Sequence, residues 1–286
     1  MAVLSKCLAC SGRHLARLVA ALALLIVLVA PHRAAAQSCT AAGPSLLLGT
    51  VNPYAGTSTT TSGTGTYSCT NPTAAAITTY ACVSVGTGTG GTSATNRTLV
   101  SGSSTIPIQI TSGGASSQIG NGTSFPMYGP ISFTTPANGT ANGTFPLVVT
   151  LPPPAAAPPP GTYTSNFTGT DAQFIYYNGS AATTCATLNA GTHLTAQPTF
   201  SVSATVATQC KVSATSMVFP TTSVLKVAVN ATATVSITCN TAVPVTIGLD
   251  NGATGTGPAT RTMKSGTVNA ITYGAWFKYG LQLEPS

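Results

Sequence analysis

The residues that could carry acid–base or metal chemistry are few in this chain of 286 residues. Its acids and histidines are Asp171, Asp250, Glu284, His14, His32 and His193. Charged residues make up 5% of the chain, whereas an ordinary soluble domain has about 25%. A catalytic carboxylate pair or a metal site needs several such groups that can meet in space. We therefore predict that the protein is not an enzyme and holds no metal or cofactor.

Nucleophilic catalysis is disfavoured on the same ground. A Ser, Thr or Cys nucleophile needs a general base, and His193 is the one histidine beyond residue 36. Cys7 and Cys10 have the spacing of half a metal site, but they lie in a segment that we expect to be removed.

Residues 1–36 have the three-part pattern of a secretory signal peptide. Basic residues lead into an apolar run of 13 residues, Leu18 to Ala30, and small residues follow up to Ala36. Such a run is short of the roughly 20 residues that span a bilayer. Cleavage before Gln37 leaves six basic and three acidic residues, so the formal net charge falls from +7 to +3. The remaining bases are scattered, which argues against a nucleic-acid partner.

Six cysteines remain after this cleavage, at Cys39, Cys69, Cys82, Cys185, Cys210 and Cys239. An even number in a secreted chain favours disulfides, and six cysteines allow about 15 pairings.

An internal repeat narrows these pairings. Cys69 follows Cys39 by 30 residues, and Cys239 follows Cys210 by 29. In each copy a Gly/Thr-rich turn and then an arginine, Arg97 or Arg261, come after the second cysteine. The simplest pairing is one disulfide per copy, Cys39–Cys69 and Cys210–Cys239, which leaves Cys82 and Cys185 to pair with each other. Because both arginines recur, we expect them to make structural hydrogen bonds.

The elements that must position these cysteines are β-strands. No long amphipathic helix is visible after Gln37, and short alternating runs such as 233–239 lie between Gly- and Pro-rich turns. We predict an all-β fold of two β-sandwich domains, 37–196 and 197–286, with a linker at 194–198. The Pro-rich segment 152–160 is expected to be an extended loop within the first domain.

The repeated motifs resemble the spore coat protein U domain family, which includes subunits of archaic chaperone–usher pili. The second copy carries the resemblance in 210–214, 217–219, 245–249 and 261–263. The first copy carries it in 38–40, 67–69 and 97–99, and 160–164 is similar to the closing strand of its domain.

This resemblance implies incomplete, immunoglobulin-like pilin sandwiches that a donated strand completes. The implied partners are a periplasmic chaperone, an outer-membrane usher and a neighbouring pilin, with export through the periplasm to the cell surface. Only Gln37 and Ser38 precede Cys39 after cleavage, too few for a donor strand of about five residues. We therefore expect a two-domain tip adhesin, with a structural coat or matrix protein as the alternative.

The adhesive surface of such a protein is weakly marked. The candidate loop is Phe125, Pro126, Met127 and Tyr128, where a proline interrupts apolar residues. The run from Phe174 to Tyr177 is a second apolar cluster, for which a place in the core is favoured. For both clusters, the alternative to an adhesive role is a place in a strand or in the core.

The end of the chain departs from the pattern. Domain two has 77 residues from Cys210 to Ser286, and the segment 275–286 holds the single Trp and one of the three acids. We expect the second sandwich to be incomplete, through a frameshift or a truncated gene, and its acceptor groove is then in doubt.

Overall fold

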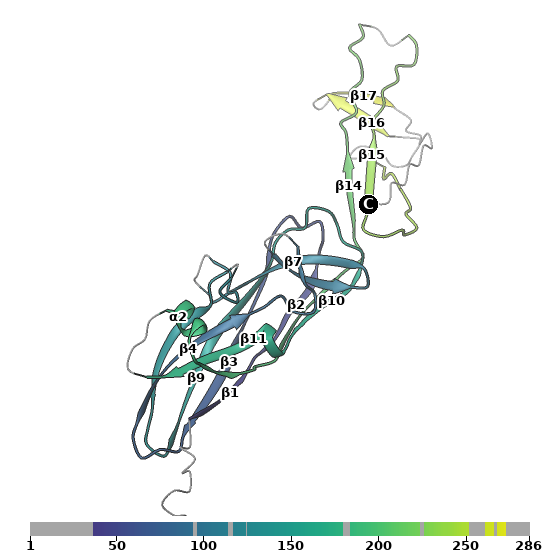
Figure 1. The fold of residues 1–286 in the computed structure, drawn as a ribbon. Helices are drawn as coiled ribbons and strands as arrows, with labels where there is room; N and C mark the ends of the chain where they lie inside the picture. The colour runs from purple at the N-terminus through teal and green to yellow at the C-terminus, as the bar shows by residue number, and fades with distance from the viewer. Residues whose placement is uncertain are drawn as a thin grey trace, which may run out of the picture.

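The computed structural model describes residues 37–93, 96–113, 117–123, 125–179, 184–223, 226–251, 261–265 and 268–272. These residues form a long β-sandwich, here called the first unit (37–206), and a thinner second unit (210–272) that extends from one end of it (Figure 1). None of the helices in the described ranges is long and apolar enough to cross a membrane.

The first unit is built from two sheets. The larger follows the order β1-β3-β9-β7-β6-β10-β13-β2, with β5 paired to β6, and the smaller follows β12-β11-β4-β8. The strands of the larger sheet are β1 (Ser38–Ala42), β2 (Ser45–Val51), β3 (Thr59–Asn71), β5 (Thr92–Ser93), β6 (Asn96–Ser101), β7 (Ser104–Thr111), β9 (Gly139–Leu151), β10 (Gly161–Phe167) and β13 (Phe200–Val206). Those of the smaller sheet are β4 (Ile77–Val85), β8 (Tyr128–Thr135), β11 (Ala172–Asn178) and β12 (Leu194–Ala196).

Two short helices lie in the connections of the first unit. A 3₁₀ turn, η1 (Gly169–Asp171), leads into β11, and α2 (Cys185–Ala190) follows it. The helix α2 begins where the Thr184 hydroxyl accepts a hydrogen bond from the Thr187 N–H, at 3.2 Å.

Alternation along the strands places one apolar face of each sheet in a common core. In β13 the buried residues are Phe200, Val202, Ala204 and Val206, every second position. Aromatic rings join the two sheets, since Tyr67 of β3 stacks on Phe174 of β11 with ring centroids 4.8 Å apart. The first unit is thus an immunoglobulin-like sandwich, as the sequence predicted.

The second unit contains two hairpins in its described residues. The strands β14 (Cys210–Ala214) and β15 (Val235–Cys239) form one, and β16 (Thr262–Ser265) and β17 (Val268–Thr272) form the other. The all-β class is therefore confirmed, although this part shows hairpins where the sequence predicted a sandwich. The tail 275–286 lies outside the described residues.

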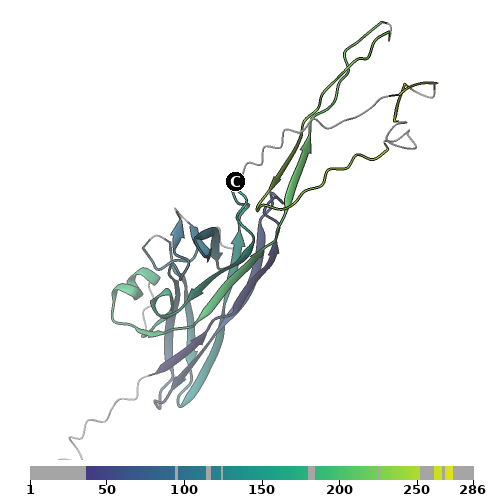
Figure 2. The same cartoon turned by 90° about the vertical axis from the view of Figure 1, so that its right-hand side faces the viewer.

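The strand that follows the predicted domain boundary joins the sheet of the first unit. We predicted that the first domain ends at residue 196, and β13, which comes after it, lies inside the larger sheet of the first unit. Its four buried side chains complete the core there, so the connection between the units is Ala207 to Gln209. Figure 2 shows β14 leaving the sandwich at the end opposite to the start of β1.

Candidate assembly interface

The strand β13 occupies a slot between β10 and β2. It pairs antiparallel with β10 over seven residues, from Gly161↔Val206 to Phe167↔Phe200. On its other side it pairs in parallel with β2, from Ser201↔Ser45 to Val206↔Val51. Both rows of its main-chain groups are therefore in use, which is how an inserted strand binds strongly.

Side chains fix the register of this insertion. The Phe200 ring stacks on Phe167 of β10, with centroids 4.5 Å apart and planes 6° from parallel. Ala204 pairs with Tyr163 of β10, and both side chains are buried. A small side chain on β13 thus lies opposite a large aromatic one. A shift by one residue would turn the buried face of β13 outward, so this register is strongly specified.

The internal repeat assigns β13 to its second copy. In the first unit β1 pairs with β3 so that Cys39 faces Cys69, and in the second unit β14 pairs with β15 so that Cys210 faces Cys239. These hairpins are equivalent, and β13 is the strand directly before the second one. The second copy of the repeat therefore contributes a strand to the first sandwich.

The three predicted disulfides are present in the structure. They join Cys39 to Cys69, Cys82 to Cys185 and Cys210 to Cys239. No disulfide crosses from the first unit to the second, so β13 is held by its hydrogen bonds and its buried side chains.

The two recurrent arginines make equivalent hydrogen bonds. Arg97 donates from Nε to Gly86 O and from Nη2 to Val85 O, residues 11 and 12 positions earlier. Arg261 makes the same pair of bonds to Asp250 O and Leu249 O, again 11 and 12 positions earlier. Burial lowers the pKa of Arg97 to about 10, and the nearby charge of Asp171 opposes that shift. Both arginines thus bind backbone carbonyls of their own unit, the structural role expected from their recurrence.

The second unit leaves apolar side chains exposed where the first unit buries them. Seven residues after its first cysteine, each copy begins a run of apolar residues, 46–48 and 217–219. Leu46 is 1% exposed, whereas its counterpart Met217 is 48% exposed. Further exposed apolar residues of this unit are Val212, Val218, Val227, Val235, Val245, Ile247, Leu249 and Met263. This unit therefore presents apolar surface of the kind that other proteins cover.

Of the four residues singled out as an adhesive loop, one is buried in the core. Met127 is buried beside the Cys82–Cys185 disulfide and Ile175, and Tyr128 begins strand β8. Phe125 is half-buried, and Pro126 is the exposed member of the four. In the run 174–177, Phe174, Ile175 and Tyr176 are buried and Tyr177 is exposed.

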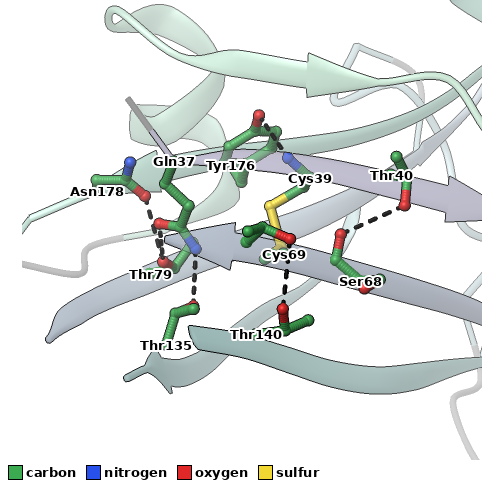
Figure 3. The surroundings of a disulfide bond; sticks show 11 residues. Gln37, Cys39, Thr40, Ser68, Cys69, Thr79, Thr135, Thr140, Tyr176 and Asn178 are labelled. Carbon is green, nitrogen blue, oxygen red and sulfur yellow. Dashed lines mark hydrogen bonds between the residues drawn. A yellow bond between two sulfur atoms is a disulfide. The ribbon is translucent and has the colours of Figure 1, made fainter. Parts of the chain in front are cut away.

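The end of the sandwich opposite the second unit is organised by two buried amides. Gln37 donates to the Thr135 hydroxyl at 2.8 Å and accepts from the Thr79 hydroxyl at 2.8 Å (Figure 3). The Cys39 N–H beside it donates to the Tyr176 hydroxyl at 3.0 Å. These bonds tie the start of β1 to the smaller sheet.

Asn71 fixes two loops at this same end. Its Nδ2 donates to Ala75 O at 2.7 Å and to Pro136 O at 3.0 Å, and its Oδ1 accepts from the Thr73 N–H at 2.9 Å. The Asn138 N–H also donates to Thr73 O at 2.8 Å. The result is a fixed pair of loops, 72–76 and 136–138, here called the distal loops. Their exposed residues are Pro72, Ala74, Ala75, Ala76, Pro136, Ala137 and Asn138. No sequence signal marked these loops, because their side chains are small and common.

The remaining polar groups to consider in the described part of the chain are His193 and the side chains that could bind a metal ion. His193 Nδ1 forms one hydrogen bond, in which it donates to Gly191 O at 2.9 Å. No group of three or more His, Cys, Asp or Glu side chains that could hold a metal ion occurs within the described ranges.

Comparison with known proteins gives a family and several solved folds. The model of the family described as Spore Coat Protein U domain matches residues 24–170 and 196–276. The second match begins just before β13, as the internal repeat requires. No curated protein matches the chain.

Among solved structures, the chain is similar to a complex from Acinetobacter baumannii, the CsuC–CsuE chaperone–tip adhesion subunit pre-assembly complex of archaic chaperone–usher Csu pili. The identity is 15%, the coverage 82% of this chain and 79% of that chain, and the TM-score 0.33. It is also similar to AggA, the major subunit of aggregative adherence fimbriae of Escherichia coli, at 14% identity, 60% and 95% coverage and a TM-score of 0.24. The CooA pilin subunit of enterotoxigenic Escherichia coli gives 11% identity, 59% and 99% coverage and a TM-score of 0.24.

Proposed function

Because the chain belongs to the spore coat protein U domain family, we propose that it is a secreted structural subunit of a chaperone–usher pilus. One observation carries the proposal: β13, a strand of the second copy of the repeat, fills the slot between β10 and β2 of the first unit. Completion of one unit by a strand from the next is the principle on which such fibres are assembled.

The exposed apolar residues of the second unit explain why the protein needs partner proteins. Its apolar positions are exposed, and an exposed strand edge with apolar side chains leads to aggregation unless another protein covers it. We propose that a periplasmic chaperone covers this unit first, that the outer-membrane usher receives the complex, and that a neighbouring pilin then takes the place of the chaperone.

The first unit suits the end of a fibre. Its slot is already filled by β13 of the same chain, so it has no vacant place for a strand from another subunit. If the first unit accepts no donor strand from another subunit, the fibre ends at the first unit. We therefore propose a tip position, exposed at the cell surface.

The distal loops are the proposed contact surface, in place of the candidate 125–128, where Met127 is buried. They lie at the end opposite the second unit, and the Asn71 hydrogen bonds fix them before any contact is made. Their exposed side chains are small, mostly apolar and uncharged. Such a surface fits a weakly hydrated, uncharged target, because little ordering and little desolvation of charge are needed on contact.

The test is to express the gene with its neighbouring chaperone and usher genes and to label the native protein with antibody-bound gold particles. The proposal expects co-purification with the chaperone and label at fibre ends. Label along the shaft would contradict the tip position, and a stable secreted monomer without fibres would contradict the pilus function and favour a coat or matrix protein.

The contact surface has a separate test. Ala74→Asp and Ala137→Asp should reduce adhesion of piliated cells to an alkyl-coated surface, because each places a charge on the distal loops. Thr64→Asp, on the exposed face of β3, is the matched control and should leave adhesion unchanged. Equal losses in all three variants would contradict the assignment.

A further inference from the structure

A buried asparagine lies where the two units meet. Asn240 follows Cys239 and is 4% exposed. Its Nδ2 donates to Pro158 O of the first unit at 3.1 Å and to Ala207 O at 2.9 Å. Its Oδ1 accepts from the Gln209 N–H at 2.9 Å, and its own N–H donates to Gln209 O at 3.1 Å. Every hydrogen-bonding group of the side chain is therefore engaged.

The repeat itself does not require this burial. The residue after the second cysteine of the first copy is Thr70, which pairs with Ser38 across the equivalent hairpin. Thr70 is exposed. The difference between two equivalent positions shows that the first unit buries Asn240 and that the hairpin of the second unit does not. A buried polar side chain that lost these partners would be left unsatisfied at a high cost.

The partner of Asn240 is a stiff element. Pro158 lies in the loop 152–160 between β9 and β10, and this loop contains six prolines. Prolines have no N–H, so at its six prolines the backbone of the loop can form hydrogen bonds only through carbonyls. Two consecutive carbonyls are used, Pro158 O by Asn240 and Pro159 O by the Tyr163 hydroxyl at 2.9 Å. The loop is thus fixed to β10 on one side and to the second unit on the other.

We infer that Asn240 is the residue that fixes the orientation of the second unit on the first. It binds both ends of the connection, Ala207 and Gln209, and attaches them to the Pro-rich loop. Without it, the units are joined by a connection of three residues that is free to bend. The contacts support this inference on their own. Its consequence, that tension on the second unit reaches β13 along a fixed direction, rests on the proposed function.

The inference is tested on the full chain by measuring distances between the units. Spin labels on unnatural amino acids at Thr64 and Ser213, two exposed positions in different units, give a distance distribution by pulsed electron resonance. Asn240→Ala should widen this distribution at least about twofold and raise cleavage of 207–209 by a nonspecific protease about fivefold, since one local anchor is lost.

Asn240→Asp is the second variant. It keeps the acceptor for the Gln209 N–H but places a carboxylate oxygen against the carbonyls of Pro158 and Ala207, so it should widen the distribution as well. Thr70→Ala, at the equivalent exposed position, is the control and should change neither readout. The melting temperature of the first unit should be unchanged in all three variants. This result would distinguish loss of the contact between the units from misfolding of the protein. An unchanged distance distribution in Asn240→Ala would overturn the inference, whatever the outcome of the pilus experiments.

Discussion

The Phe200 ring of β13 lies on the Phe167 ring of β10 at a centroid distance of 4.5 Å. Phe200→Ala should lower the free energy of unfolding by about 3–5 kcal/mol, because a buried aromatic ring is removed from a packed core. Urea unfolding monitored by far-UV circular dichroism measures this change in the free energy of unfolding. Ser203→Ala, on the opposite face of the same strand, is the control and should cost less than about 0.5 kcal/mol. Equal and small effects would mean that β13 is not part of the core.

A second prediction concerns the close packing of β3 on β9. Tyr67 faces Gly143, and a Cβ at Gly143 would lie 2.2 Å from the Tyr67 hydroxyl. Gly143→Ala should therefore cost about 1–3 kcal/mol of stability through overpacking. Thr144→Ala, one residue along on the exposed face, should be close to neutral. Adding Tyr67→Leu to Gly143→Ala should recover part of the loss if the ring is what the new methyl group meets.

The disulfides should differ in their contribution to stability. Cys82–Cys185 closes a loop with a sequence separation of 103, and Cys39–Cys69 one of 30. In the chain-entropy description the longer loop contributes about 1 kcal/mol more. Pairwise replacement by alanine, with unfolding measured in oxidising buffer, tests the order. A larger loss for the Cys39/Cys69 pair would contradict it.

The buried tyrosines should make the protein sensitive to alkali. Burial raises the pKa of Tyr67, helped by the nearby Tyr128, and burial also raises the pKa of Tyr163. A group whose folded pKa exceeds its unfolded value stabilises the fold below the unfolded pKa, here about 10, and this stability is lost as the pH rises further. We expect stability to fall above about pH 10 and to fall less in Tyr67→Phe.

The lowered pKa of Arg97 acts in the opposite direction, because its folded form binds protons less tightly than the unfolded one. The comparison of wild type with Tyr67→Phe removes this contribution, since Arg97 is common to both. An identical pH dependence in the two proteins above pH 10 would contradict the prediction.

The sequence was informative where a local signal fixes a contact. The cysteine spacing, repeated twice, predicted two disulfides, because each copy brings its own cysteines together across one hairpin. The third disulfide, Cys82–Cys185, followed as the pair that remained. The recurrence of Arg97 and Arg261 likewise predicted structural hydrogen bonds, and the structure shows that both side chains bind backbone carbonyls 11 and 12 residues earlier.

Long-range contacts were beyond such signals. The alternation in 200–206 predicts a strand but does not specify which sheet it joins, so the place of β13 in the sheet of the first unit was not predicted. Met127 resembles an exposed loop residue in sequence, yet it is buried by Ile175 and by the Cys82–Cys185 disulfide, about 50 residues away. The distal loops depend on Asn71, which also binds Pro136 O on a different connection, 65 residues away.

The most direct test of strand donation is to cut the chain before β13 and ask whether the pieces stay together. A protease site inserted after the exposed Gln197 separates 37–197 from 198–286, and no disulfide crosses that cut. Paired β13 should hold the two fragments as one species in native size-exclusion chromatography and release them in denaturant, and Val202→Asp should release them without denaturant. If the cut fragments separate in native buffer while 37–197 keeps its fold, β13 is not the strand that completes the first unit.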